Sequence, residues 1–526
     1  MLRAPIAIRL VSLKKFNQQC EKERYLHIKG INSEDDNIMK QNPQLLKPVI
    51  LLNIDSLMSE PLEVAIQTGR APALQFLMEN GNYIPDMVTS YPTMSVTIDS
   101  SLLTGTYADK HHVPGLTWFD NSRKEVINYG TGFRETFRLG MRRSVHNMLY
   151  RLNNEHMSSE VTTIYEELAD RGIPSASINS FVYRGNIPQK LRTPRLFSTL
   201  TRFKNGEWIT NATNIFSLGT FSKLRPWGVA TQIAAGNYKF TARELRYLIR
   251  KNKLPKFTFC IFQDMDARIH LKGPMDIKGI TKIDKEIQKT LDLYPSWEEA
   301  INRNTWLVMG DNGHSPTGTN HRDFVIDLRK GLKKYRISRL ERPVHKKDQL
   351  VLCVNQRMAY IYILDDHLPL SAIVECLNND QRIDIIAWKN ENFIHVESGM
   401  REGSLKYRPG GSFTDIYNQT WSIEGDPELL DLNLTNEKEL AYSNYPDALM
   451  RLYSVLNSHS GRFIVVNAKP GCEFKAQSSP VHLSGAAHGS LHKQESLVPL
   501  IISGTKEKPI YPRVVDIKEF IIRLIQ

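Results

Sequence analysis

Three apolar runs, each followed closely by an acidic side chain, limit most strongly what this chain can fold into. The runs cover residues 48–54, 257–262 and 306–310, and the acids are Asp55, Asp266 and Asp311. Such continuous apolar runs are typical of parallel strands buried on both faces, whose carboxyl ends meet at one edge of a sheet. The pattern therefore predicts an α/β fold with acids along the active edge of its sheet.

Each acid has a simpler structural explanation when it is taken alone. Asp55 could be only the N-cap of the next helix, and Asp266 could lie in a solvated polar loop. If that loop is instead helical, Asp266 and His270 lie on one face, four residues apart, and can share one metal ion. Asp311 and Asn312 precede Gly313, so their turn could serve a metal or merely reverse the chain.

Two further segments carry groups suited to catalysis. His488 lies in a loop of small residues, 485–490, where it has few neighbours to pack against, which disfavours a structural role. Residues 91–105 crowd hydroxyls at a predicted loop-to-helix junction, where free N–H groups favour an attacking alkoxide and phosphate oxygens. Serine and threonine are also ordinary capping residues. Spacing alone does not choose among Thr93, Ser95 and Thr97.

The order of these segments resembles the alkaline phosphatase superfamily, and most closely the prokaryotic members of its type I phosphodiesterase and nucleotide pyrophosphatase branch. Pro92-Thr93-Met94-Ser95 stands nine residues before Thr104-Gly105, where that family carries its covalent nucleophile. The resemblance runs from about Lys47 to the C-terminus and implies Ser95 as the nucleophile. It also implies a three-layer α/β sandwich with a central, mostly parallel sheet and an inserted cap subdomain.

The same resemblance implies two divalent metal ions, for which zinc is the first expectation. One ion would be held by Asp266, His270 and His488, and the other by Asp55, Ser95 and Asp311. Asn312 replaces the usual histidine of the family, which would suit manganese, magnesium or calcium at the site of Asp55, Asp311 and Asn312. His314, two residues later, is the alternative ligand that could compensate, and the sequence leaves this choice open.

A second departure concerns substrate binding. The Pro-Asn-His that commonly follows the nucleophile is replaced here by Thr97-Ile98-Asp99, so the amide that holds a phosphate oxygen is missing. We expect the side chains of four further residues to contact the substrate: Thr97, Asp99, Arg268 and His314. Arg268 in particular could supply the extra cation that monoesterases generally use.

The predicted activity is metal-dependent hydrolysis of a phosphodiester or a nucleotide pyrophosphate through a phosphoserine intermediate on Ser95. A phosphomonoesterase or phosphomutase of the same superfamily would use the same ligands, and a catalytically weakened member would only bind an anion. Sulfatases share the Asp-Asn-Gly sequence, but the segment from Ser95 to Asp99 lacks the proline and arginine of their motif. The sequence therefore disfavours a sulfatase.

Composition supports this interpretation and narrows the partners. A chain of 526 residues with 41% hydrophobic content can bury a large core, as an enzyme requires. The net charge of +12 favours a small anionic phosphoester as substrate. Basic runs such as those near residues 329–334 and 342–347 are typical of solvated faces, so they give no firm evidence for nucleic acid.

The remaining features concern location and organisation. Five widely spaced cysteines, no convincing signal peptide and no apolar run of membrane length predict a cytoplasmic protein. We expect a polar N-terminal arm (1–46), a catalytic α/β core (47–330), an inserted cap subdomain (331–440), and the remainder of the core with the last metal ligand (441–526). Within these, Pro409-Gly410-Gly411 is predicted to separate strands, and residues 462–467 to form a strand of the core.

Overall fold

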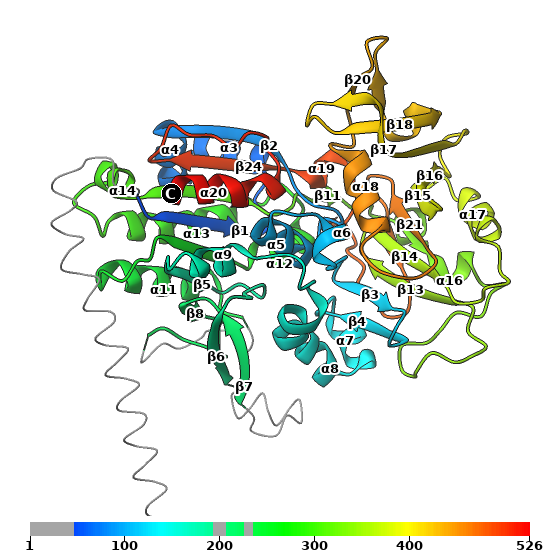
Figure 1. Cartoon of the computed structure of the whole chain (residues 1–526), viewed down its shortest axis with the longest axis horizontal. Coiled ribbons are helices and arrows are strands. Elements are labelled where there is room, and N and C mark those ends of the chain that lie inside the picture. Colours follow the sequence, from blue (N-terminus) through cyan, green and yellow to red (C-terminus); the bar gives the residue numbers. More distant parts are fainter. Residues whose placement is uncertain (1–46, 193–206, 226–234) are drawn as a thin grey trace, which may run out of the picture. The chain divides into compact units, whose positions relative to one another are not determined.

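The computed structural model describes residues 47–192, 207–225 and 235–526, so the predicted arm of residues 1–46 lies outside the described part. Residues 48–526 form one compact unit, and the account below concerns that unit. Two large sheets organise it, and each has its own set of covering helices (Figure 1).

The first sheet contains seven strands in the order β2-β24-β10-β1-β9-β5-β8. Their bounds are β1 (Val49–Ile54), β2 (Gly81–Val88), β5 (Ser175–Ile178), β8 (Ile215–Ser217), β9 (Phe257–Phe262), β10 (Thr305–Gly310) and β24 (Leu497–Ser503). The five strands from β10 to β8 are parallel, whereas β24 is antiparallel to both β10 and β2. The mostly parallel sheet expected from the three apolar runs is confirmed.

Side chains of β1 alternate between two apolar layers, as the period of a strand requires. Ile50, Leu52 and Ile54 belong to one buried cluster with α3 (Ser59–Gln67), α4 (Pro72–Glu79), α11 (Tyr238–Arg250), α12 (Met265–Lys272), α13 (Lys278–Leu291) and α14 (Trp297–Arg303). Val49 and Leu51 belong to another with α5 (Ser95–Thr104), α9 (Ile164–Asp170) and α20 (Ile517–Ile525), and this cluster extends to α18 (Ala448–Leu456), which contacts β15 (Ile383–Asn390) of the second sheet. Helices therefore cover both faces, as in a three-layer sandwich.

The second sheet contains nine strands, almost all antiparallel, in the order β13-β14-β21-β15-β16-β17-β20-β19, with β18 on β17. Their bounds are β13 (Leu350–Asn355), β14 (Met358–Ile363), β15 (Ile383–Asn390), β16 (Phe393–Glu397), β17 (Leu405–Asp415), β18 (Thr420–Gly425), β19 (Leu432–Leu434), β20 (Glu439–Tyr442) and β21 (Phe463–Ala468). One of its faces shares the buried cluster of Val49 and Leu51, so a continuous apolar core joins the two sheets.

Two expectations about this region were wrong. The strand predicted near residues 462–467 is β21, but it pairs with β14 and β15 in the second sheet and not with the core strands. Pro409-Gly410-Gly411 does not separate strands, because it lies inside β17, where the register shifts between Pro409 and Phe413. A bulge absorbs the glycine at positive φ without ending the strand. The division of the chain at residues 330 and 440 stays a prediction.

The remaining elements are shorter and lie outside the two large sheets. They are the hairpins β3 (Thr117–Asp120) with β4 (Glu125–Asn128) and β6 (Ile187–Arg192) with β7 (Glu207–Ala212), the pairs β11 (Ser315–Pro316) with β23 (Ala486–Ala487) and β12 (Val325–Asp327) with β22 (Glu473–Lys475), and the helical segments α6 (Ala108–His111), α7 (Phe133–Leu139), α8 (Met141–His146), η1 (Asn147–His156), α15 (His321–Phe324), α16 (Leu328–Gly331), α17 (Leu370–Asn378), η2 (Pro427–Leu430), α19 (Lys493–Ser496) and η3 (Val514–Asp516). No helix among the described residues is long and apolar enough to cross a bilayer. The four cysteines of that part are free, and the cytoplasmic location stays a prediction.

Candidate active site

Three acids meet at the carboxyl edge of the first sheet because their strands are neighbours. Strand β1 pairs in register with β10 and β9, so that Ile54 lies opposite Gly310 on one side and Phe262 on the other. Asp55 and Asp311 directly follow β1 and β10, and Asp266 lies in the first turn of α12, just after β9. The sheet register therefore brings Asp55 together with two acids that lie more than 200 residues later in the sequence.

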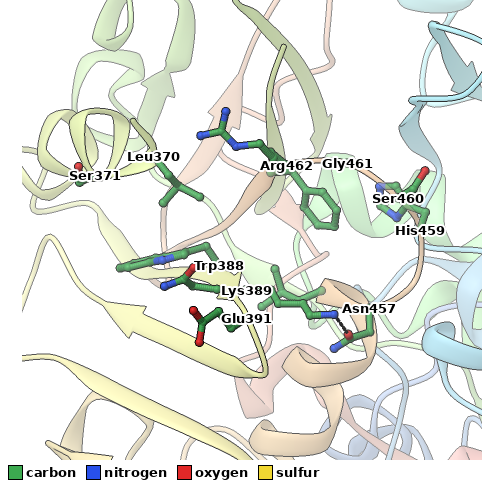
Figure 2. Close-up of a pocket in the computed structure, with 13 residues that line it drawn as sticks. Leu370, Ser371, Trp388, Lys389, Glu391, Asn457, His459, Ser460, Gly461 and Arg462 are labelled. Carbon is green, nitrogen blue, oxygen red and sulfur yellow. Dashed lines mark hydrogen bonds between the residues drawn. The ribbon is translucent and has the colours of Figure 1, made fainter. Parts of the chain in front are cut away.

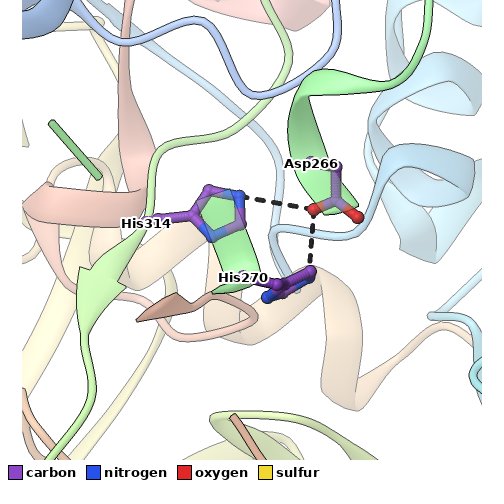
Figure 3. Close-up of side chains that lie close together, drawn as sticks. All are labelled: Asp266, His270 and His314. Carbon is purple, nitrogen blue, oxygen red and sulfur yellow. Dashed lines mark ion pairs between the residues drawn. The ribbon is translucent and has the colours of Figure 1, made fainter. Parts of the chain in front are cut away.

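Three imidazoles surround one oxygen of Asp266. The Nε2 atoms of His270, His314 and His488 lie 3.0, 3.4 and 3.4 Å from Oδ1 of Asp266, and Figure 3 shows the first two of these contacts. The ligand atoms of Asp266, His270 and His314 lie within 4.8 Å of one another, which makes them a possible metal-binding group. Asp266 and His270 leave α12 on the same face, as the spacing of four residues predicts.

The electrostatics of Asp266 and its neighbouring imidazoles are compatible with a bound metal ion. Burial alone would raise the pKa of Asp266, but the facing imidazoles, His270 foremost, hold the pKa of that carboxyl well below its ordinary value. Burial lowers the pKa of His314 to about 3, so this imidazole is neutral and its Nε2 can offer a lone pair. A carboxylate beside neutral imidazole nitrogens is the donor set that zinc prefers.

Backbone carbonyls fix the orientation of two of the imidazoles. Nδ1 of His270 donates to the carbonyl of Ala486 over 2.7 Å, and Nδ1 of His488 donates to the carbonyl of Thr93 over 2.5 Å. These bonds through Nδ1 turn the Nε2 atom of each ring toward Asp266. This arrangement is typical of metal-ligating histidines.

The loop of His488 can reach this position only because its small residues allow close packing. A Cβ at Gly489, where φ is +113°, would lie 2.3 Å from the carbonyl oxygen of Asn355. The Gly489 amide donates to the hydroxyl of Thr93 over 2.7 Å. The small residues noted in the sequence therefore have a packing role as well as a conformational one.

A second group of oxygens lies next to the first. Asp311 accepts hydrogen bonds from the backbone amides of Ser56 and Asn312, each over 2.8 Å, and the hydroxyl of Ser95 opposes the rise in the pKa of this carboxyl. The pKa of Asp55 lies well above its ordinary value, first because of burial and then because of the charges of Asp311 and Asp266. These carboxyls repel one another unless a cation lies between them.

The donor set of the second group fits a metal ion. The side-chain oxygen of Asn312 is buried and lacks a hydrogen-bond partner among the described residues. A buried, unpartnered amide oxygen is costly unless a ligand satisfies it. Together with the mutually repelling carboxyls, it points to a cation bound by oxygen.

His314 belongs to the first group and not to the second. Its Nε2 lies 2.9 Å from the hydroxyl oxygen of Ser56 and 3.4 Å from Asp266, whereas no contact with Asp55 or Asp311 is recorded in the described residues. No contact among the described residues therefore supports the hypothesis that His314 takes the place of Asn312 at the second group.

The three hydroxyls that spacing could not separate differ in their surroundings. Thr93 and Thr97 are fully buried, and Thr93 is occupied with the loop of His488. Ser95 is partly exposed and is the first residue of α5, whose Met94 N-cap supplies no side-chain hydrogen bond. Ser95 alone of the three contacts Asp311.

Two of the residues predicted to contact the substrate, Asp99 and Arg268, have partners within the protein. Asp99 is buried on α5 and accepts a hydrogen bond from Nδ2 of Asn53 over 3.1 Å, and burial followed by the charge of Asp311 raises its pKa well above the ordinary value. Arg268 forms an ion pair with Asp276 over 2.5 Å. No contact between Arg268 and either metal-binding group is recorded among the described residues, so its role in substrate binding stays a prediction.

Sequence reasoning missed residues that support the ligands. Gln356, in the turn between β13 and β14, donates from Nε2 to His488 Nε2 over 3.1 Å and accepts the amide of His488 over 3.0 Å. The ring of His482 stacks on that of His270 with centroids 4.0 Å apart, and Glu473 holds His482 through a 3.0 Å ion pair. In the sequence, only the spacing of His482 and His488 could have indicated this support. No local sequence pattern marks Gln356.

A separate cavity of about 660 Å³ opens beside β15 and contains none of the predicted site residues. Figure 2 shows Trp388, Lys389 and Arg462 around it. Lys389 donates to Asn457 over 2.7 Å, and Arg462 donates to backbone carbonyls near residue 366. Because Lys389 and Arg462 already donate hydrogen bonds within the protein, the cavity has less capacity to bind an anion than its residue composition suggests.

Residues 49–490 match the family described as type I phosphodiesterase / nucleotide pyrophosphatase. The chain belongs to this family. Among solved structures, it is similar to murine ectonucleotide pyrophosphatase/phosphodiesterase 5, with a TM-score of 0.53 and 12% identity over 91% of this chain and 95% of that chain. The human protein of that name gives 0.53 and 13% identity over the same shares, and an inactive murine variant in complex with AMP gives 0.52 and 12%.

At these identities the solved structures establish the fold, and both the fold and the family expected from the sequence are confirmed. The curated proteins contain no match to the chain.

Proposed function

We propose that this protein is a metal-dependent phosphoric ester hydrolase that cleaves phosphodiesters or nucleotide pyrophosphates with Ser95 as its nucleophile. The observation that carries the proposal is the position of Ser95 at the start of α5, where its hydroxyl lies beside Asp311 and opposes the rise in the pKa of that carboxyl, next to a cluster of acids and imidazoles. Membership of a family of phosphodiesterases supports the reaction class.

We assign two metal positions from the donor sets. Asp266, His270 and His488, with His314 beside them, would hold zinc; Asp55, Ser95, Asp311 and Asn312 would hold the second ion. Because the second set consists of oxygens alone, manganese, magnesium or calcium suits it as well as zinc. When bound, such ions neutralise phosphate oxygens and lower the pKa of a coordinated hydroxyl.

The residues themselves define the remaining steps. Asp311 lies beside the Ser95 hydroxyl and so orients its oxygen for attack on phosphorus. As the new Oγ–P bond forms and the bond to the leaving oxygen breaks, the hydroxyl proton passes to Asp311 or water and the leaving oxygen takes up a proton, which gives a phosphoserine that keeps the second ester group of a diester substrate. The N-terminal N–H groups of α5 can stabilise the nonbridging oxygens in both steps. Water then cleaves the phosphoserine, and Ser95 regains its hydroxyl.

The substrate is proposed to be a small phosphodiester. Arg268, the candidate for holding the additional charge of a monoester, is paired with Asp276, which favours a diester over a monoester. The complex of the related murine protein with AMP supports a small phosphoester ligand.

The test compares hydrolysis of bis(p-nitrophenyl) phosphate and p-nitrophenyl phosphate by metal-stripped protein refilled with zinc, manganese, magnesium or calcium. We expect faster diester cleavage, and a loss of at least about a thousandfold in Ser95→Ala, as is typical for removal of a nucleophile. Ser100→Ala is the matched control, because Ser100 lies on the same helix and its hydroxyl donates to the carbonyl of Val96.

Faster monoester cleavage would instead indicate a phosphatase. Turnover that survives Ser95→Ala would refute the assignment of the nucleophile. Stoichiometric metal binding without turnover on either ester would favour a member that only binds its anion.

A further inference from the structure

A strongly basic cavity lies on helices α11 and α13, which pack side by side against the first sheet (Figure 1). Its volume is about 780 Å³, and none of the residues of the candidate active site lines it. Six cationic side chains line it: Arg225, Arg243, Arg246, Arg250, Lys251 and Lys289. Asp292 is the single acid among the described lining residues.

Some of these cations belong to the fold. Arg246 pairs with Glu286 over 2.7 Å and also donates to the Glu286 carbonyl, and Lys289 pairs with the same carboxylate over 2.8 Å. Arg225 pairs with the fully buried Glu244 over 2.5 Å. These contacts hold three of the lining cations in place, and they use the carboxylates of Glu244 and Glu286.

The other cations have no such role. Arg243, Arg250 and Lys251 are exposed, and none makes a side-chain hydrogen bond or ion pair within the described residues. Arg243 and Arg250 lie seven positions apart on α11, which places them two turns apart on one face, with Arg246 between them. One terminal nitrogen of Arg225 is also buried and has no hydrogen-bond partner among the residues that the structure describes.

Six cations around one cavity, with Glu244, Glu286 and Asp292 as the neighbouring acids, leave a net excess of three positive charges. Like charges held together repel, and an anion that bridges them removes this cost. Arginine forks match the paired oxygens of a phosphate group and bind them with two parallel hydrogen bonds.

We propose that this cavity binds a small oligophosphate, separately from the catalytic chemistry at Ser95. Its concave form and several spaced arginines fit a ligand with two or three linked phosphate groups. Arg243 and Arg250 would contact the ligand directly, and Arg246, held by Glu286, would fix the geometry between them.

The experiment measures binding of inorganic tripolyphosphate by calorimetry to the full chain carrying Ser95→Ala, so that turnover cannot consume the probe. We expect saturable binding that weakens as salt is raised, because exposed charges are screened over about 10 Å at 0.1 M ionic strength. Arg243→Ala combined with Arg250→Ala should raise the dissociation constant by roughly tenfold or more, since two charge-assisted contacts are lost.

Arg70→Ala combined with Arg322→Ala is the matched control. It removes two exposed arginines that make no recorded side-chain contacts and do not line the cavity, and it should leave binding unchanged. A second arm uses vesicles of phosphatidylcholine with and without phosphatidic acid. Binding to the acidic vesicles without binding to tripolyphosphate would overturn the proposal in favour of a membrane surface.

Two further results would also overturn it. Unchanged affinity in the Arg243/Arg250 double variant would place the oligophosphate elsewhere, the catalytic site included. Absence of saturable binding at low salt would show that the basic cavity is only a solvated face.

Discussion

The buried ion pair between Arg357 and Glu495 should dominate the stability of the loop that carries His488. Both side chains are fully buried, and the pair joins the turn after β13 to the start of α19. Arg357 also donates to the carbonyls of Cys472 and Ala468 over 3.0 and 2.9 Å. Glu495 accepts the amide of Ser490 over 2.6 Å, so the pair fixes both sides of the loop.

Replacing Arg357 by methionine removes the cation but keeps most of the volume. The Glu495 carboxylate would then be buried without its partner, a change that costs about 3–5 kcal/mol in comparable proteins. Because the Arg357 amide also donates to the carbonyl of His488 over 3.0 Å, loosening this turn should weaken metal binding too. We therefore expect a lower urea midpoint and a lower zinc affinity in the same variant.

The assay is urea unfolding followed by fluorescence, with Arg357→Met, Glu495→Gln and the double variant compared in one cycle. The double variant should lose clearly less free energy of unfolding than the two single losses added together, because it leaves no unpaired charge. Arg462→Met is the control: this arginine is 39% exposed, and its replacement should cost less than about 1 kcal/mol. A similarly small loss in Arg357→Met, or strict additivity in the cycle, would refute the reasoning.

Two further predictions test the pH dependence of stability and the metal group. Burial raises the pKa of Glu135 to about 7 from an ordinary 4.5, so the folded state keeps its proton longer and stability falls as pH rises between these values. Glu135→Gln should remove this loss, worth up to about 3 kcal/mol at pH 8 and little below pH 4.5; equal urea midpoints at pH 8 would contradict it. His314→Ala should lower zinc affinity by at least about tenfold in competition with a chelator, whereas His321→Ala, an exposed histidine, should not; unchanged affinity would remove His314 from the metal group.

The sequence predicted features that depend on neighbouring residues. The strands before Asp55 and Asp311 followed from apolar runs, and both are present. For Asp266 and His270 the sequence left a loop and a helix open, and the structure has the helix.

Features that depend on distant partners could not be predicted in this way. Strand β21 reads like any buried strand, and only its pairing with β14 and β15 places it in the second sheet. The position of His314 depends on the direction of a turn, and Gln356 reaches His488 from a different sheet. A local pattern carries no information about such contacts.

The insertion of β24 between β2 and β10 determines when during synthesis the catalytic edge can be completed. Strand β2 ends at Val88, yet its described neighbour in the first sheet, β24, begins only at Leu497, so it is made about 400 residues later, and His488 is made shortly before it. At about 5–20 residues per second, the nascent chain would hold an unfinished sheet edge for tens of seconds. A truncated product ending before residue 485 would therefore lack both the last imidazole and the strand that closes the sheet, and we expect it to be recognised by chaperones and proteases as unfolded.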